Sequence, residues 1–447
     1  MTADLTAAQR DDVTTASPLR SPADGVRPSR WSMTHAQASE RSAILLTLLW
    51  LGSRALTAAT LYVSAMAATG DAKYYFSSLS GLTHGGTLAT TFREYPVPVL
   101  SVLYPQFAIS GNNEQRYLIL FCLSMMVVDA FLTAILWRRC GRRIGTAVVF
   151  WLVFVPLLGN IAYFRFDLIP GVLVALAILF LAKRPALAAA ATAIAAAFKL
   201  WPAVLIAVLA LSGRRRRIIG AFLATGVGAA LLSIVTAGFT RTISPLSWQK
   251  DRGLQMESIA ATPLMLARRF GPDKLWQVHQ SQFTAVEIFG PGVHTAIRIT
   301  SLLSIVGALV LAWLWFRTRN LGTVPIDLLA TLILATILLM VLANKTLSPQ
   351  YLIWIGAPIA ALLALNPNQF VRRAAWTMLL VAALTQYEFP YDYPDIVAGT
   401  DGYGLGVLAL SLRNALLCWL AYDTCREIFR RTRRPVLVSF GAALPIS

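Results

Sequence analysis

Residues 70–105 carry the side chains with the clearest potential for chemistry, in the sequence GDAKYYFSSLSGLTHGGTLATTFREYPVPVLSVLYP. The stretch directly follows the first strongly apolar segment and contains two acids (Asp71 and Glu94), two cations (Lys73 and Arg93), paired tyrosines and several prolines. A simple tether between two membrane spans would not need these groups. Aromatic surface, one well-placed acid and nearby cations are what an enzyme acting on a sugar and a phosphate requires. Asp71 is therefore the first candidate for a catalytic residue.

Transfer of a sugar from a lipid phosphate to a hydroxyl would need a general base, because the attacking hydroxyl must lose its proton. An exposed aspartate has a pKa of about 3.9, and partial desolvation near a membrane would make Asp71 more basic. The leaving phosphate gains charge and is stabilised by cations. The cations available for this purpose are Arg93, Lys199, Arg252 and Lys345. The sequence contains no glycine-rich phosphate motif and no metal-ligand spacing, so this interpretation requires neither a metal nor another cofactor.

The composition places the chain in a membrane. Of its 447 residues 57% are hydrophobic and only 13% are charged, and the mean hydropathy is +0.62. A spanning helix needs roughly 20 apolar residues, and lipid favours helices because each satisfies its own backbone hydrogen bonds. The sequence therefore predicts an all-α polytopic membrane protein.

The formal net charge of +18 does not indicate nucleic-acid binding. The arginines and lysines fall in short clusters between apolar runs, which is the positive-inside pattern of cytoplasmic loops, and they do not gather on one folded face. Twelve of the 21 acids lie in the loops assigned to the opposite side, whereas the inner loops contain mostly arginine. The four cysteines show no disulfide or metal pattern. We therefore expect a plasma-membrane protein with an extracytoplasmic site and both termini in the cytoplasm.

The apolar runs divide the chain into three parts: a disordered cytoplasmic tail over residues 1–41, a transmembrane domain over residues 42–434, and a second tail over residues 435–447. Counting the runs gives about twelve crossings. Long outer loops are expected over residues 67–116, 240–295 and 385–403. Within the first loop, near-helical spacing of apolar residues at 72–82 and 97–107 predicts short helices lying in the membrane interface.

Residues 183–214 predict a hairpin of two short helices. Both ends are basic and should be cytoplasmic, and about 13 residues at 1.5 Å each reach only roughly 20 Å. The two helices would meet at the sequence FKLWP, which places Lys199 at the buried tip. A lysine at that depth is costly unless it has a partner or lines a wet cavity, so it is a functional candidate; a snorkelling or structurally paired lysine is the alternative.

Further candidates for substrate binding lie in the outer loops and at the ends of the spans. Together with those already named, the predicted substrate-binding set is Lys73, Tyr74, Arg93, Glu94, Asp167, Lys199, Arg252, Glu257, Lys345, Gln350 and Tyr351.

Structural alternatives exist for several of these residues. Asp71 could instead cap the helix that follows it, Glu94 could pair with Arg93, and Asp167 could pair with Arg165. Charged residues within the spans are expected to pair or to line the interior; these are Arg54, Asp129 and Arg413. As a whole, the chain could also be a transporter or lipid flippase, which would favour internal repeats and polar groups near the membrane midplane.

The sequences GDAKYY, REYP, FRFDLIP, AAAFKLWPAVL, DRGLQMES, NKTLSPQYLIW and SLRN, in this order, resemble the actinobacterial members of glycosyltransferase family 87. The resemblance covers residues 43–434. It implies a GT-C fold and a transferase that moves a sugar, mannose in the α-mannosyltransferases, from a polyprenyl phosphate to a cell-envelope glycolipid or glycan. It also implies that Asp71 matches the family's catalytic base. Gln350 and Tyr351 stand where better-known mannosyltransferases of the group carry histidines, so arabinofuranosyl and glucosyl transfer remain alternatives.

Overall fold

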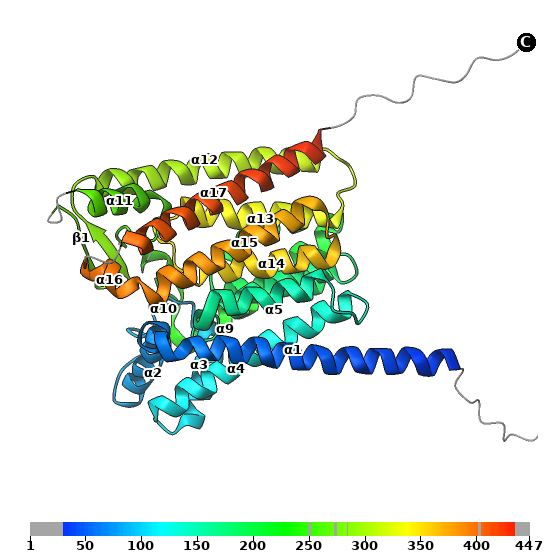
Figure 1. Cartoon of the computed structure of the whole chain (residues 1–447), viewed down its shortest axis with the longest axis horizontal. Coiled ribbons are helices and arrows are strands. Elements are labelled where there is room, and N and C mark those ends of the chain that lie inside the picture. The colour runs from blue at the N-terminus through cyan, green and yellow to red at the C-terminus, as the bar shows by residue number, and fades with distance from the viewer. Residues whose placement is uncertain (1–29, 249–251, 272–274, 284, 401–403, 434–447) are drawn as a thin grey trace, which may run out of the picture.

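The computed structural model describes residues 30–248, 252–271, 275–283, 285–400 and 404–433. Figure 1 shows a bundle whose long helices run in roughly one direction across the molecule. Smaller elements gather at one end of this bundle.

Six helices in the described part of the chain are long and apolar enough to cross a membrane. They are α1 (Arg30–Ala68), α4 (Glu114–Arg139), α9 (Arg215–Ala237), α12 (Val293–Arg319), α13 (Ile326–Ala343) and α17 (Gly404–Thr432). Each coincides with an apolar run of the sequence, which supports a multi-pass membrane protein, whereas the count of about twelve crossings stays a prediction. Residues 30–41 were expected to be disordered, but α1 already begins at Arg30. Residues 1–29 and 434–447 lie outside the described part.

Shorter helices complete the bundle. They are α5 (Thr146–Leu158), η2 (Gly159–Ala162), α6 (Leu168–Phe180), α7 (Pro185–Phe198), η3 (Trp201–Leu205), α8 (Ile206–Leu209), η4 (Ala210–Ser212), α14 (Tyr351–Leu365) and α15 (Gln369–Gln386). The predicted break at FKLWP is present, because α7 ends at Phe198 and the next helical turn begins at Trp201. The second arm of the predicted hairpin consists of the three short turns η3, α8 and η4 instead of one helix.

The loops expected on the outer side contain the remaining elements. They are α2 (Gly70–Thr83), η1 (Val97–Val99), α3 (Leu100–Ser110), α10 (Phe239–Trp248), η5 (Ile259–Ala261), α11 (Thr262–Phe270), β1 (Gln277–Gln280), β2 (Val286–Phe289), η6 (Tyr387–Tyr391) and α16 (Tyr393–Ala398). The helices predicted over 72–82 and 97–107 are present. The described structure is helical apart from one small element that was not predicted. This element is an antiparallel hairpin in which Val278 of β1 lies opposite Ile288 of β2. Both side chains are buried in a second apolar cluster with Leu254 and Met256.

The two ends of the bundle differ in content. In Figure 1, α2, α11, α16 and β1 lie at one end, while the first turn of α1 and the last turn of α17 lie at the other. The described chain therefore begins and ends on the same side of the bundle, as an even number of crossings requires.

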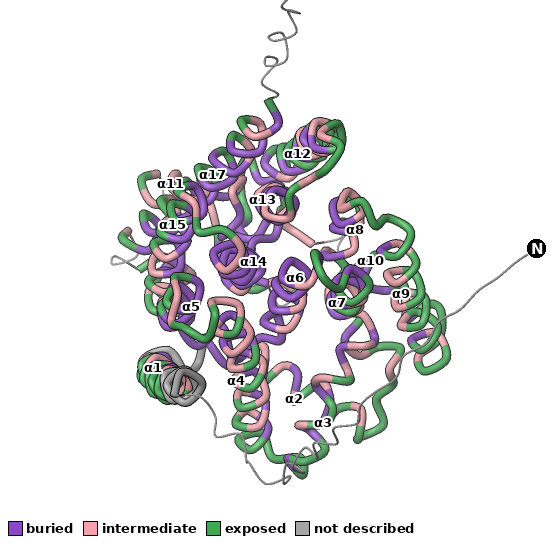
Figure 2. The backbone as a smooth tube through the Cα atoms, turned by 90° about the vertical axis from the view of Figure 1, so that its right-hand side faces the viewer, coloured by how far each residue is buried: buried purple, intermediate pink, exposed green. Residues whose placement is uncertain are grey.

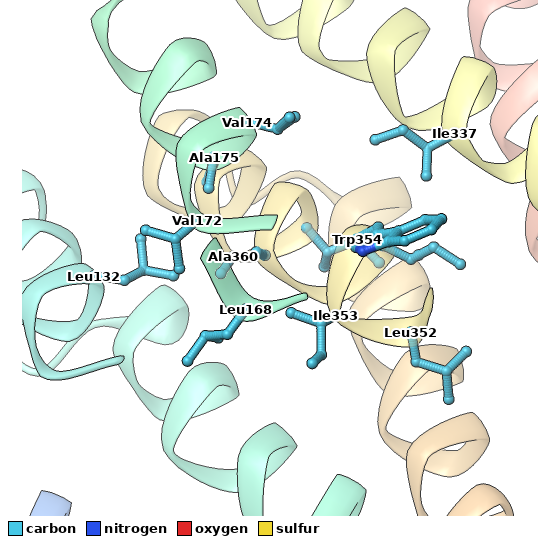
Figure 3. Close-up of a cluster of buried hydrophobic side chains, with 14 of the residues drawn as sticks. Leu132, Leu168, Val172, Val174, Ala175, Ile337, Leu352, Ile353, Trp354 and Ala360 are labelled. Carbon is cyan, nitrogen blue, oxygen red and sulfur yellow. The ribbon is translucent and has the colours of Figure 1, made fainter. Parts of the chain in front are cut away.

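The main core forms where α6 packs against α14. In Figure 2, α14 lies among the surrounding helices and is largely buried, and Figure 3 shows side chains of the two helices, including Val172 and Ile353, in one apolar cluster. Gly171 lets the two helices approach closely, because a Cβ atom there would lie 3.0 Å from Ile353 Cγ2 and 3.1 Å from the Ile353 carbonyl oxygen.

Two charged residues in the interior of the bundle are paired with each other, as expected. Arg54 of α1 and Asp129 of α4 are both buried and form a salt bridge of 2.7 Å. Trp50, Trp151 and Tyr163 also donate hydrogen bonds to the Asp129 carboxylate. The predicted neutralisation of Arg54 and Asp129 is thus confirmed.

The α6–α14 contact can be tested with a single methyl group. We expect Gly171→Ala to lower the stability of the fold by about 1–3 kcal/mol, because the backbone of Ile353 cannot move aside cheaply. Gly220→Ala in α9 is the matched control: nothing lies within 4 Å of its would-be Cβ, so the helix should be unchanged or slightly more stable. The thermal unfolding midpoint in detergent measures both. Equal midpoints for the two variants would contradict the close packing.

Candidate active site

A cavity of about 540 Å³ lies at the end of the bundle where the small elements gather. Its walls come from all three outer loops, from the tip of the α7 hairpin and from the start of α14. The predicted site residues that line it are Asp71, Tyr74, Glu94, Lys199, Arg252, Glu257, Lys345, Gln350 and Tyr351. Residues separated by up to 280 positions in the chain therefore meet in one chamber.

Three predicted residues do not line the cavity. Lys73 is exposed on α2. Arg93 lies over the ring of Trp248, which does line the cavity, at 5.8 Å from the ring centroid. Asp167 is buried behind Lys199. These three residues are therefore not part of the cavity wall.

Asp71 lies in the first turn of α2 and is held by an arginine. Its Oδ2 atom forms a salt bridge with Arg165 Nε at 2.6 Å, and the aspartate side chain is 32% exposed whereas that of the arginine is 8% exposed. Both residues line the cavity, and the carboxylate is the more exposed of the two groups. Thr69 occupies the cap position of α2, so the alternative of Asp71 as a helix cap is not observed.

Lys199 occupies the break between α7 and η3, as predicted, and it has a buried partner. Its Nζ atom lies 2.9 Å from Asp167 Oδ1. The ammonium also lies within 6 Å of four aromatic ring centroids, those of Tyr95, Phe166, Tyr351 and Trp354. The alternative pairing of Asp167 with Arg165 is not observed, since Asp167 pairs with Lys199 and Arg165 pairs with Asp71.

Glu94 is held by a tyrosine of α2. The Tyr74 hydroxyl donates to Glu94 Oε1 at 2.6 Å. Burial, and then the Glu94 carboxylate, raise the pKa of Tyr74 above its ordinary value, so the phenol keeps its proton and stays a donor. The alternative pairing of Glu94 with Arg93 is not observed, because Arg93 contacts Trp248 instead.

A single arginine fastens the first outer loop to α10. Arg241 is buried and donates to the carbonyl oxygens of Leu88, Thr91, Phe92 and Tyr95 at 2.7–3.2 Å. Five N–H donors in a rigid planar group suit such a cluster of carbonyls. The contact fixes the segment that carries Glu94 into the cavity wall.

The second outer loop is held by β2 and by the segment before α14. The Met256 amide donates to the Val286 carbonyl, and the Ile288 amide donates to the Leu254 carbonyl, so the segment lies along β2. The Gln255 amide donates to the Lys345 carbonyl at 3.1 Å. The hairpin that sequence reasoning missed is thus the support on which Arg252, Gln255 and Glu257 are presented.

Stacked aromatic rings form one wall. Trp354 stacks on Tyr351 at 4.0 Å and on Trp201 at 4.9 Å between ring centroids. Among the described residues, the indole nitrogens of Trp201 and Trp354 and the Nε atom of Arg252 are buried donors without a hydrogen-bond partner. A buried donor without a partner is unfavourable, so these groups are suited to a bound ligand rich in oxygen.

Sequence reasoning missed several residues of this site. Arg165 was considered only as a partner of Asp167, and Trp354 and Gln255 stood in quoted motifs without being selected. The roles of Tyr95 and Arg241 could not be predicted, because they depend on contacts between Tyr95 and Lys199 and between Arg241 and the first outer loop, which are distant in the sequence. The sequence FRFD was the one clue that could have singled out Arg165, because it places this arginine two positions before Asp167 at the end of an apolar run.

A family model described as glycosyltransferase family 87 matches residues 94–344. The chain belongs to glycosyltransferase family 87. The matched range of this family 87 member includes Glu94, Lys199 and Glu257, whereas Asp71 and Gln350 lie outside it. No curated protein and no solved structure matches the chain. Family membership makes the chain a membrane glycosyltransferase with a sugar donor and an acceptor, and it does not favour the transporter or flippase alternative.

The arginine that fastens the first loop provides a test of how the site is built. We expect Arg241→Met to lower the free energy of unfolding by roughly 2–3 kcal/mol, because four carbonyl oxygens lose their common donor. Amide hydrogen exchange should increase over residues 88–95. Arg116→Met is the control, since that arginine is exposed at the start of α4. Unchanged exchange over residues 88–95 in the Arg241 variant would show that the arginine does not hold the loop.

Proposed function

We propose that this family 87 member transfers a sugar, with mannose as the first candidate, from a polyprenyl phosphate to a hydroxyl of a cell-envelope glycolipid or glycan. The reaction would take place on the extracytoplasmic face of the plasma membrane. The observation that supports this most is the Asp71–Arg165 pair, which faces a chamber that also contains Arg252, Lys199 and Lys345.

Asp71 is the proposed general base. Arg165 forms a salt bridge with Oδ2, and among the described residues no hydrogen bond to Oδ1 is seen. An acceptor hydroxyl could donate to this free oxygen and pass its proton to it as the hydroxyl oxygen bonds to the anomeric carbon of the sugar. The bond from that carbon to the phosphate oxygen breaks at the same time.

The leaving lipid phosphate would take up the negative charge. Arg252 is the first candidate to bind it, because its Nε atom is a buried donor without a partner among the described residues. Lys345 follows α13, and its carbonyl accepts from Gln255. Two cations at one wall stabilise a phosphate whose charge grows during the reaction.

The aromatic wall supports a carbohydrate substrate. Sugar rings present C–H faces that pack on aromatic surfaces, and their hydroxyls satisfy donors at the edges. Tyr351, Trp354 and Trp201 form a continuous stacked surface, and the indole N–H groups of the two tryptophans are buried without a partner among the described residues. Gln350 beside this wall gives the proposed sugar site an amide where a histidine was expected from related enzymes.

The base assignment has a direct test. Purified protein is incubated with polyprenyl-phosphate mannose and an envelope glycolipid extract, and product formation is followed. We expect Asp71→Asn to lower kcat by about 10²–10⁴, because the amide cannot accept the proton. Glu114→Gln, at an exposed acid of the same outer loop, should retain wild-type turnover. Equal turnover by the Asp71 variant and the wild type would remove the assignment. Absence of product with several lipid-linked sugars would contradict the proposed donor.

A further inference from the structure

Two buried carboxyl groups take no part in the chemistry proposed above. Glu257 of the second outer loop lines the cavity, Glu388 lies in η6, and neither has exposed surface. The Oε1 atom of each is buried without a hydrogen-bond partner among the described residues. Two ionised carboxylates would leave both of these oxygens without a donor, whereas a protonated carboxyl group is itself a donor. The pair therefore holds one proton between its two carboxyl groups.

Arg413 of α17 decides which carboxyl is charged. Its Nη1 atom forms a salt bridge of 3.0 Å with Glu388 Oε2, and this guanidinium is also fully buried. Its contact with Glu257 is to the backbone carbonyl, at 2.8 Å. One guanidinium and one carboxylate are neutral together, whereas a second carboxylate would leave a buried charge without compensation. The charge therefore belongs to Glu388 and the proton to Glu257.

The other groups around the pair do not change this assignment. Arg165 and Tyr393 face Glu257, and Asp392 acts on Glu388. Burial first, and then the charge of Glu388, raise the pKa of Glu257 well above its ordinary range. Burial also raises the pKa of Glu388, but Arg413 opposes the rise.

Glu257 also orients a group that reaches the cavity. Its Oε2 atom accepts from Gln255 Nε2 at 3.1 Å. Gln255 lines the cavity, and its backbone amide donates to the Lys345 carbonyl. Glu257 is thus connected, through one side chain, to the wall that carries the cations.

We infer that Glu257 is a proton-bearing positioning residue, which orients Gln255 and keeps the wall beside the phosphate-binding cations neutral. The inference rests on the proposed function, because a neutral wall matters for an anionic donor. An ionised Glu257 would repel the donor phosphate and compete with it for Arg252 and Lys345.

Two isosteric variants separate this role from a purely structural one. Glu257→Gln keeps the shape of the side chain and leaves the charge on Glu388, beside Arg413. Glu388→Gln keeps the shape and the net charge of the pair, but it moves the carboxylate to Glu257. We expect the KM for the lipid-phosphate donor to rise about tenfold more in Glu388→Gln than in Glu257→Gln. Equal changes in the two variants would overturn the inference.

The proton itself has an independent readout. The infrared carbonyl band of a protonated carboxyl should be present in the wild type at pH 7 and absent from both variants. In the wild type, the donor KM should rise as pH rises through the elevated pKa of Glu257, since the wall then becomes negative; in Glu257→Gln this rise should be missing.

A wild-type spectrum without this band would also overturn the inference. If the wild type shows the band but transfers no sugar, the proposed function fails while the shared proton stands. Should a variant fail to fold, the pH dependence of the wild-type band and of the wild-type donor KM decides.

Discussion

This structure depends on one constraint: a charged group that is removed from water needs a partner of opposite charge. Charged groups buried in a membrane protein are costly unless they are paired. Among the described residues, four such pairs each join two different segments of the chain: Arg54 with Asp129, Asp71 with Arg165, Asp167 with Lys199, and Glu388 with Arg413. The first lies within the bundle, the second and Lys199 of the third line the cavity, and Arg413 of the fourth contacts the backbone of Glu257 in the cavity wall. The salt bridges that compensate the buried charges thus also hold the segments of the site together.

The pairs also explain why the outer loops are built as they are. A cavity that holds cations for a phosphate needs acids near by, but free acids would repel the same ligand. Asp71 and Asp167 each form a salt bridge with a cation, Glu94 accepts from a phenol, and Glu257 is the proposed carrier of a proton. Most of the negative charge around the cavity is therefore already engaged before a substrate binds.

The sequence predicted the helices and much of the cavity wall because these depend on local patterns. Apolar runs mark the spans, basic clusters mark their ends, and the break at Lys199 follows from a segment too short to cross twice as full helices. Partners could not be predicted in the same way. Arg165 and Asp167 stand two residues apart, yet α2 provides the partner of one and the tip of α7 that of the other. The two short strands were missed because their burial depends on Leu254 and Met256, which come from another part of the loop.

The position of the chain ends has a practical consequence. The first turn of α1 and the last turn of α17 lie at the end of the bundle opposite the outer elements (Figure 1). A fluorescent reporter or an affinity handle joined beyond either helix would extend away from the chamber and leave its mouth clear. Antibody fragments raised against α2 or α16 would approach from the other side and block it. Immobilised by either terminus, the enzyme would present its working face to added lipids.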